Sequence, residues 1–456
     1  MSAQKLTENK MGVMPLTRLL INMALPMIIA MIVQALYNVV DSIYVSRISE
    51  SAVTALSLAF PVQNIMIGFA TGIGVGVNAL LSKSLGEGDQ KTAGRAAGNG
   101  FFLVAVVTVL FALFGIFGAR PFFAMQSDVA ETVEGGTAYI AICSIFAAGI
   151  FVEVLGERLL QASGRTIYTL ITQGTGAVLN IILDPVFIFG VEWLGIKPMG
   201  IAGAAVATVI GQWVAAILAL IFNFKCNPEV QFGIKDLIPS KRVVSNILTV
   251  GVPSIIMVAV GSVMNFSMNQ ILQGFNETAT SVFGIYFKLQ SFFFMPLFGL
   301  NNGTVSIVAF NYGARKPERI IGTLKRSCAM ALGVMIVGLL VFQFAPDLLL
   351  GIFNPSDEFL RIGRSALRQI SWAFPMAAIG IALTAGFQAL GNGSYSTIIS
   401  LCRQMLVLLP AAYLLSLSGE VTRVWWAFPI AETVSLTVTL LFFLRIYRRK
   451  IKPLNE

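Results

Sequence analysis

Long apolar segments separated by short polar connections run through almost the whole chain. Each segment holds roughly 20–30 residues, enough for a helix to cross the ~30 Å hydrocarbon core of a membrane. The pattern predicts twelve membrane-spanning helices, near residues 16–46, 52–82, 94–119, 134–160, 166–190, 199–224, 244–272, 279–310, 320–345, 361–388, 393–416 and 422–444. The polar connection 225–243 divides them into an N-terminal lobe of six helices, residues 1–224, and a C-terminal lobe, residues 244–456.

Composition supports an all-α polytopic membrane protein. Hydrophobic residues make up 56% of the 456 residues and charged residues 12%, whereas soluble domains carry about 25% charged residues. The start MSAQKLTENK is polar and lacks the apolar core of a signal peptide, so we expect no cleaved leader. The chain contains no histidine and four scattered cysteines, which excludes a Ser–His–Asp triad and a histidine metal site. We therefore expect neither an enzyme nor a cofactor.

The net charge of +9 raises the question of a nucleic-acid partner. Most Lys and Arg residues lie in the connections on the N-terminal side of the membrane, including Arg315, Lys316, Arg319 and the run RIYRRK near the C-terminus. By the positive-inside rule, this distribution places both termini in the cytoplasm, as an even number of helices requires. The excess of Lys and Arg thus reflects the orientation of the protein in the cell membrane. Membrane lipid is an expected partner and nucleic acid is not.

The two halves resemble each other at a constant offset of 227 residues. The matched residues are Pro, Asn, Gln and Gly, which are the less common residue types in apolar helices. They pair Pro26 with Pro253, Asn38 with Asn265, Gln63 with Gln290, and Gly72, Gly76 and Gly86 with Gly299, Gly303 and Gly313. Six helices per half imply a parallel repeat about an axis along the membrane normal, an architecture found in transporters. Gly72, Gly76, Gly299 and Gly303 are predicted to permit close helix approach.

Polar side chains form one stripe on the first predicted helix. Gln34, Tyr37, Asn38 and Asp41 follow one another at i, i+3, i+4 and i+7, so they share a face. The stripe is either a hydrogen-bonding seam between helices or a functional surface. An acid at the centre of a membrane helix costs roughly 2.5–3.5 kcal/mol. A hydrogen-bonding seam does not need an acid. We therefore favour a functional role for Asp41.

The fifth and sixth predicted helices carry further polar candidates. Asn180 and Asp184 lie four residues apart on one face, and Pro185 removes a backbone hydrogen bond beside them. Spacing alone fits Asp184 equally well as a functional acid or as part of an Asp-Pro helix end. In GIAGAAVAT, the small residues permit close packing. Thr208 offers a hydroxyl, and taken by itself this hydroxyl is better explained by a hydrogen bond to its own helix.

Other charged residues interrupt the apolar helices, and for most of them we favour structural ion pairs. Glu157 is predicted to be a solvated or paired residue at a helix end, beside Arg158. The second half has Met268 where the first has Asp41, so the acids are concentrated in the first half. The remaining charged residues are Glu153, Lys288, Arg368, Arg403 and Glu432.

The sequence resembles the multidrug and toxic compound extrusion (MATE) family over almost its whole length. The resemblance rests on PMIIAMIVQALYNVVDSIYVSRI, LLQASGRT, VLNIILDPVFIFG, GIAGAAVAT, NNGTVSIVAFNYGAR and AFPIAE. It implies a V-shaped pair of six-helix lobes that exports bulky, mostly cationic amphiphiles in exchange for H⁺ or Na⁺. We expect a monomer that works by alternating access in the plasma membrane.

The resemblance also implies roles for individual residues. Asp41, Asn180, Asp184 and Thr208 match the first-lobe cation site of the branch resembling the DinF proteins, and Pro26 matches a proline whose kink accompanies protonation. The NorM-like branch places additional acids in helices seven and ten, where this sequence has Asn265, Met268 and Arg368. The pattern is therefore closer to the DinF-like branch. For the substrate surface we predict the polar, aromatic and methionine residues Gln34, Tyr37, Asn38, Phe60, Gln63 and Met66.

Two carboxylates in a partly dry pocket repel each other, so at least one should bind a proton or cation readily. A site that cannot hold the cation and a cationic drug together would couple their fluxes, with H⁺ favoured over Na⁺ as the coupling ion. The alternative is a flippase for lipid-linked oligosaccharide or lipid, which would favour arginines that hold pyrophosphate. An integral membrane enzyme that modifies lipids is a weaker alternative, because the chain lacks histidine and a catalytic loop of any length.

Overall fold

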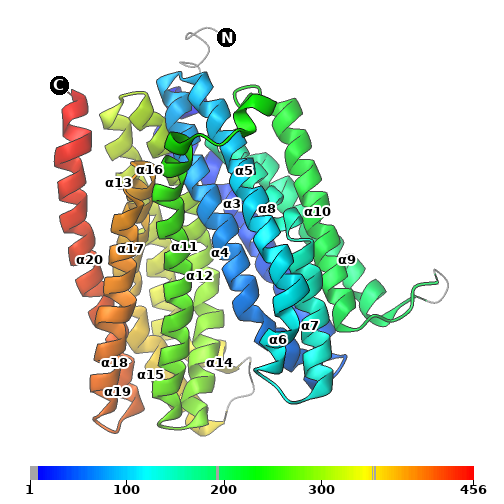
Figure 1. The fold of residues 1–456 in the computed structure, drawn as a ribbon. Helices are drawn as coiled ribbons and strands as arrows, with labels where there is room; N and C mark the ends of the chain where they lie inside the picture. Colours follow the sequence, from blue (N-terminus) through cyan, green and yellow to red (C-terminus); the bar gives the residue numbers. More distant parts are fainter. Residues whose placement is uncertain (1–8, 192–194, 352, 354–355, 456) are drawn as a thin grey trace. The chain divides into compact units, whose positions relative to one another are not determined.

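The computed structural model describes residues 9–191, 195–351, 353 and 356–455, with the side chains of residues 38, 39, 50 and 455 left undescribed. Helices account for nearly all of this part of the chain (Figure 1). Its one β feature is an isolated bridge between Val191 and Ile196. The predicted all-α membrane fold is confirmed.

The chain forms two compact units. The first unit comprises Ile29–Ile255, and so takes the later part of α3 (Leu16–Ser46) and the first part of α11 (Lys241–Gln273). Between these two helices lie α4 (Glu50–Glu87), α5 (Gln90–Leu113), η1 (Phe114–Gly118), α6 (Ala119–Ala124), α7 (Ala130–Ile145), α8 (Ala148–Ala162), α9 (Thr166–Phe189), α10 (Ile201–Cys226) and η3 (Ile234–Leu237).

The second unit comprises the described residues up to Ile28 and those from Ile256 onward. It therefore begins with α2 (Lys10–Val13) and the first part of α3, and continues with the later part of α11. The rest consists of α12 (Glu277–Gly313), α13 (Pro317–Phe344), α14 (Pro346–Gly351), α15 (Asp357–Ser371), α16 (Phe374–Ala389), α17 (Gly393–Leu401), η4 (Cys402–Leu408), α18 (Leu409–Ser416), α19 (Val421–Val424), α20 (Ala427–Ile446), η5 (Tyr447–Ile451) and η6 (Lys452–Asn455).

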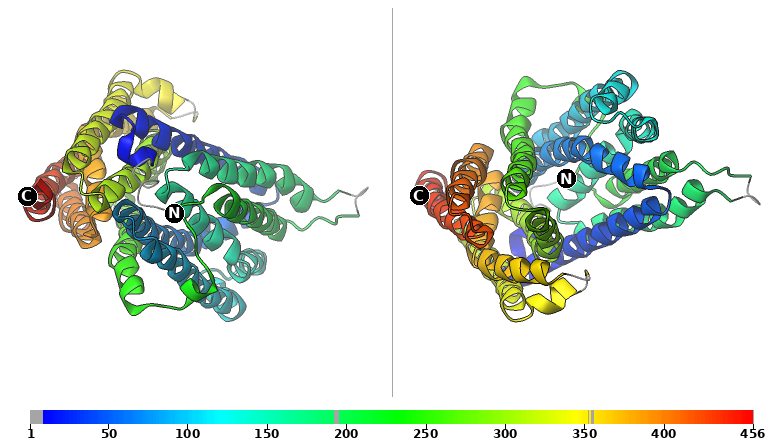
Figure 2. Two further views of the ribbon diagram at one scale, coloured as in Figure 1. Left: turned by 90° about the horizontal axis from the view of Figure 1, so that it is seen from above. Right: turned by 90° about the horizontal axis from the view of Figure 1, so that it is seen from below.

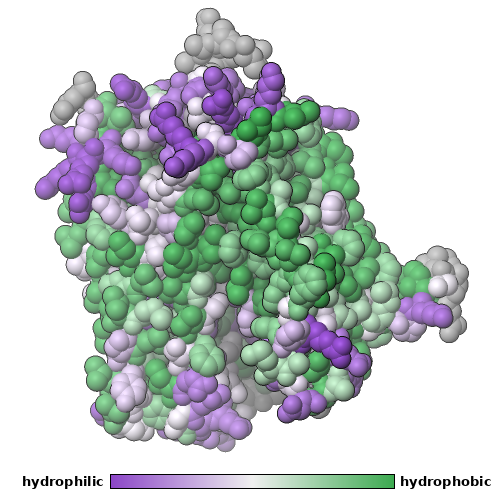
Figure 3. All heavy atoms as spheres, in the orientation of Figure 1, coloured by the Kyte–Doolittle hydropathy of each residue, from purple (hydrophilic) through white to green (hydrophobic). Residues whose placement is uncertain are grey.

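Twelve membrane spans fit the helix lengths. Within the described residues, ten helices are long and apolar enough to cross a membrane, and two bent pairs raise the number to twelve. The pairs are α7 with α8, bent by 46°, and α15 with α16, bent by 48°, at equivalent places in the two halves. Hydrophobic side chains cover the middle of the helices, and hydrophilic ones gather toward their ends (Figure 3).

Each unit takes the first part of a long helix from the other half of the chain. Helix α3 changes unit between Ile28 and Ile29, just after Pro26, and α11 does so between Ile255 and Ile256, just after Pro253. The compact units differ by this exchange from the predicted lobes, residues 1–224 and 244–456. The polar connection suggested a division at 225–243, because sequence alone does not show which neighbours a long helix meets on either side of a proline.

Glycines allow the exchanged helix parts to pack closely within each unit. In the first unit, a Cβ on Gly76 of α4 would lie 2.2 Å from the carbonyl oxygen of Ile247 in α11, and one on Gly72 would lie 2.8 Å from that of Gly251. In the second unit, a Cβ on Gly299 of α12 would lie 2.9 Å from the backbone nitrogen of Ile28. The predicted close approach is confirmed at these three glycines. It is looser at Gly303, where the nearest atom is the Met27 methyl at 3.2 Å.

The repeat extends to polar contacts that the apolar pattern does not reveal. Ser49 caps α4 by accepting a hydrogen bond from the backbone N–H of Ala52 at 3.1 Å, and it donates to Glu131 at 3.0 Å. At the equivalent place in the second unit, Asn276 caps α12 at Ala279 (2.8 Å) and donates to Glu358 (3.0 Å). These caps satisfy backbone donors at the start of α4 and α12. The bonds to Glu131 and Glu358 connect each of these helices to the bent helix pair of its own unit.

Candidate functional site

Two buried acids from different helices of the first unit meet. Asp41 comes from α3 and is 8% exposed, and Asp184 comes from α9 and is fully buried. The two carboxyl groups lie within hydrogen-bonding reach of each other, and a bond between them requires one shared proton. The other carboxyl oxygen of Asp41, Oδ1, is buried without a partner among the described residues. The pair can therefore bind or release a proton or another cation at one buried position.

Asn180 connects this acid pair to α10. Its amide is oriented so that donors meet acceptors, with Nδ2 donating to Oδ2 of Asp184 at 3.0 Å. Oδ1 then accepts from the backbone N–H of Thr208 at 3.1 Å and from its hydroxyl at 3.2 Å. Asn180 and Thr208 are both buried, so these bonds are shielded from water. The sequence favoured a bond from Thr208 to its own helix, whereas the structure directs its hydroxyl to Asn180.

Small residues bring α9 and α10 close enough for this network. A Cβ on Gly203 would lie 2.5 Å from the Phe187 carbonyl, and one on Gly211 would lie 2.8 Å from the Gly176 oxygen. Figure 2 shows the two helices side by side in the first unit. Asn180 and Thr208 lie between these two crossings, where side chains from both helices are within direct hydrogen-bonding distance. The predicted close packing in GIAGAAVAT is confirmed at Gly203.

Further polar groups surround the acids. Tyr37 is half-buried, and its electrostatic neighbours include Asp41, Asp184 and Glu153. Gln63 on α4 donates from Nε2 to the hydroxyl of Tyr139 on α7 at 2.8 Å. Sequence reasoning missed Tyr139, which is 2% exposed. A lone tyrosine in an apolar helix gives no periodic signal, and only its partner Gln63 pointed to it.

The predicted substrate residues divide by exposure. Gln34 and Phe60 are exposed, whereas Met66 is buried and its sulfur accepts from the Ser144 hydroxyl at 3.9 Å. Asn38 belongs to α3, but its side chain lies outside the described part of the structure. Whether any of these residues contacts a substrate stays a prediction. Pro26 lies inside α3, immediately before the helix changes unit.

The other charged residues differ in their surroundings. Glu153 is half-buried and Lys288 is exposed, and neither forms the predicted ion pair among the described residues. Arg403 and Glu432 form the predicted ion pair, with Nη1 and Oε1 3.1 Å apart. Arg368 is exposed and donates to the carbonyl oxygen of Gln343 at 3.2 Å, so the predicted ion pair is wrong for this residue. Glu157 is buried and accepts from Thr172 at 2.8 Å and Gln173 at 3.0 Å, which makes it a paired residue rather than a solvated one.

Among the described residues, no group of three or more His, Cys, Asp or Glu side chains is placed to hold a metal ion. The oxygens of Asp41 and Asp184, with those of Asn180 and Thr208, form the strongest candidate site for a proton or a monovalent cation.

A family model described as MatE matches the chain twice, over residues 26–186 and 253–414. The two matches start at Pro26 and Pro253, which is the same offset as the internal repeat. Together they cover well over half of the chain.

Curated relatives and solved structures agree with this match. The multidrug export protein MepA of Staphylococcus aureus is 25% identical over 438 residues, spanning 94% of this chain and 93% of MepA. MepA of Staphylococcus haemolyticus is 24% identical, spanning 91% of this chain and 90% of that protein. A solved MATE P26A mutant superposes with a TM-score of 0.90 at 25% identity, covering 98% of this chain and 99% of the other. A MOP superfamily transporter from Pyrococcus furiosus gives 0.88 at 25% identity, covering 96% and 97%.

Proposed function

Since the chain belongs to the MatE family, we propose that it exports bulky organic cations across the plasma membrane in exchange for a coupling cation. The observation that carries the proposal is the buried pair Asp41–Asp184 held by Asn180 and Thr208. The multidrug export named for its MepA relatives supports this class of substrate. Both termini are proposed to lie in the cytoplasm, on the basis of the Lys and Arg distribution.

Exchange follows from competition at the acid pair. Two carboxyl groups this close cannot both remain charged without a compensating positive charge. When the pair holds a proton, it attracts a cationic drug weakly, and when the proton leaves, the restored negative charge favours the drug. The protein therefore alternates between a protonated state and a drug-bound state, and the proton gradient drives export.

H⁺ is proposed over Na⁺ because the local hydrogen bonds already fit a proton. Asp41 and Asp184 lie within hydrogen-bonding reach, and a single proton is enough to join them. The Asn180 oxygen that could coordinate Na⁺ instead accepts two donors from Thr208. The lack of an acid at Met268, together with the acid pair in the first unit, favours the DinF-like branch.

Alternating access is proposed to use the prolines of α3 and α11. Each helix belongs to both compact units and changes unit just after its proline. A proline removes one helical hydrogen bond, so bending costs least there. Pro26 and Pro253 are thus proposed as matched hinges.

A flippase function is less well supported. Its anionic head group would need free arginines, yet Arg403 is paired with Glu432 and Arg368 lies at an exposed position against a backbone carbonyl.

The test is transport by purified protein in liposomes loaded with a fluorescent cation such as ethidium. The proposal expects dye movement when ΔpH alone is imposed, and much less with ΔNa⁺ alone. Movement with ΔNa⁺ alone would overturn the choice of ion, and no movement with either gradient would overturn the export of cations.

A further inference from the structure

A buried amide in the second unit has an unused end. Gln404 is 6% exposed, and its Nε2 lies 3.1 Å from the hydroxyl of Ser400. Its Oε1 is buried and has no hydrogen-bond partner among the described residues. Because the Ser400 hydroxyl can donate or accept, the amide could also be turned around, and one of its two ends would still be unpaired. Buried polar groups without partners are rare and call for an explanation.

The backbone beneath Gln404 is irregular. Residues Cys402–Leu408 form a π-helical segment between α17 and α18. Pro410 follows it and cannot donate to the carbonyl of Leu406, which accounts for a widened turn at this place. Single π-helical turns occur frequently at functional sites, because the extra residue re-aims nearby side chains. Here the turn carries Arg403 and Gln404 in succession.

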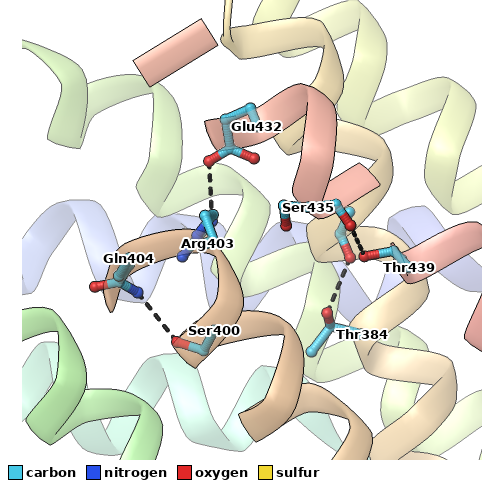
Figure 4. Close-up of polar contacts among 8 residues, drawn as sticks. Thr384, Ser400, Arg403, Gln404, Glu432, Ser435 and Thr439 are labelled. Atoms are coloured by element: carbon cyan, nitrogen blue, oxygen red, sulfur yellow. Dashed lines mark hydrogen bonds and ion pairs between the residues drawn. The ribbon is translucent and has the colours of Figure 1, made fainter. Parts of the chain in front are cut away.

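The neighbouring polar groups already have partners (Figure 4). Arg403 is paired with Glu432 at 3.1 Å, and the two side chains are 28% and 15% exposed. Thr384 donates to the Gly380 carbonyl at 2.9 Å, and Thr439 donates to the Ser435 carbonyl at 2.7 Å. In Figure 4 the Gln404 oxygen points away from these groups. The free end of the amide therefore faces outward from the cluster that holds it.

Helix α11 leaves room in front of this amide. A Cβ built on Gly261 would lie 3.8 Å from Oε1 of Gln404, and, apart from the adjoining residues and backbone of α11 itself, no other atom lies within 4 Å of that Cβ. Gly261 is half-buried and adds no side chain in front of this oxygen. A polar group of a ligand that reaches Oε1 would therefore approach past position 261.

We propose that Gln404 is a substrate-binding residue, which hydrogen-bonds an uncharged hydroxyl or amide group of the exported molecule in the second unit. This inference rests on the proposed export function and adds a specificity element to it. A neutral group is expected because Arg403 and Glu432 neutralise each other and leave no net charge beside the amide to attract a charged group. The acids of the first unit then select for charge, and Gln404 selects for a hydrogen-bonding group.

Two probes that differ by one hydroxyl test this proposal. Tetraphenylphosphonium is a cation without any hydrogen-bonding group, and (4-hydroxyphenyl)triphenylphosphonium adds one phenol. Binding of both is measured on the full-length protein in detergent, and export of both is measured in liposomes. Gln404→Leu should weaken binding of the phenol by about fivefold, the value of one ordinary hydrogen bond, and leave tetraphenylphosphonium unchanged. An equal change for both probes, or no change for either, would overturn the proposal.

A second pair of variants leaves Gln404 in place. Gly261→Ser puts a hydroxyl within reach of the free Gln404 oxygen, so it should compete with the phenol and weaken its binding several-fold. Gly261→Ala adds the same Cβ without the hydroxyl and is the matched control. If Gly261→Ala weakens phenol binding as much as Gly261→Ser does, the effect is steric and the proposed hydrogen bond is wrong. Failure of the wild-type protein to export tetraphenylphosphonium would count against the export function instead.

Discussion

The Asn180 amide donates to Asp184 at 3.0 Å and accepts from Thr208 of α10 at 3.1 and 3.2 Å, and so links one acid of the buried pair to that helix. Asp184 therefore presents one oxygen to Asn180, while its carboxyl group is also joined to Asp41. Donor bonds of this kind favour the charged carboxylate, whereas burial and the neighbouring acid favour the neutral one. The opposition of these effects makes reversible proton binding at this pair physically reasonable.

Thr208 should matter through its hydroxyl. Thr208→Val removes the 3.2 Å bond to Asn180 but keeps the shape of the side chain, so we expect a loss of about 1 kcal/mol in stability. Export driven by ΔpH should fall several-fold, because Asn180 then holds Asp184 less firmly. Thr208→Ser retains the hydroxyl and is the control. Equal export by the Val and Ser variants would contradict this role.

Gly76 should tolerate no side chain. Even a Cβ would lie 2.2 Å from the Ile247 carbonyl oxygen, and backbone cannot move aside as a flexible side chain can. Gly76→Ala should therefore destabilise the protein by at least the 1–3 kcal/mol that is typical of overpacking. Gly284→Ala in α12 has nothing within 4 Å of its Cβ and should be neutral or slightly stabilising. Thermal unfolding in detergent compares the two, and equal melting temperatures would show that α4 and α11 do not cross tightly at Gly76.

The Arg403–Glu432 pair is expected to stabilise the second unit without coupling transport. Arg403→Met leaves Glu432 without its partner and should cost about 2 kcal/mol, below the 3–5 kcal/mol of fully buried pairs because both side chains are partly exposed. The double variant Arg403→Met with Glu432→Leu should recover most of that loss. Stability is read from thermal unfolding in detergent, and a double variant less stable than Arg403→Met would contradict the assignment.

Asp89 should give the α4–α5 turn a pH-dependent stability. Hydrogen bonds from the side chain and backbone N–H of Thr92 hold the pKa of Asp89 below its usual value. The stabilisation is therefore complete above the ordinary aspartate pKa and is lost as pH falls through the lowered value. Asp89→Ala should cost about 1 kcal/mol near neutral pH and much less in acid, whereas Asp89→Asn should cost little. Melting temperatures measured across acidic pH test this, and a constant loss for Asp89→Ala at every pH would refute it.

The sequence predicts the parts of this fold that depend on the pattern of apolar residues and on the energetic cost of a charge in a membrane. Twelve apolar segments give the spans, and the offset that pairs Pro26 with Pro253 also places the two bent helix pairs at matching positions. Asp41 was identifiable because a carboxylate in lipid is expensive. Asp184 was ambiguous on spacing alone, and its role depends on the contact with Asp41, which is a tertiary relationship.

What the sequence does not reveal depends on which side chains meet. The π-helical turn at Cys402–Leu408 has no sequence signature beyond Pro410, so the charge of Arg403 stands out in the sequence and the neighbouring Gln404 does not. Tyr139 was missed because its hydrogen bond comes from Gln63 on another helix. The exchange of helix parts after Pro26 and Pro253 depends on long-range packing that hydropathy does not encode.

The central claim is that coupling resides in the acid pair of the first unit. Asp41→Asn keeps the size of the side chain but cannot release a proton, so ΔpH-driven export should stop, and a cationic drug should bind only as weakly as it does to the protonated pair. Asp184→Asn should have the same or nearly the same effect. Glu432→Gln should be much milder, because its carboxylate is committed to Arg403.

The most direct test is dye export by these three variants in liposomes under an imposed ΔpH, with equal amounts of folded protein confirmed in the membrane. The predicted result is no export by Asp41→Asn, little or none by Asp184→Asn, and substantial export by Glu432→Gln. Export at the normal rate by Asp41→Asn, together with an inactive Glu432→Gln, would contradict the account and place the coupling site in the second unit.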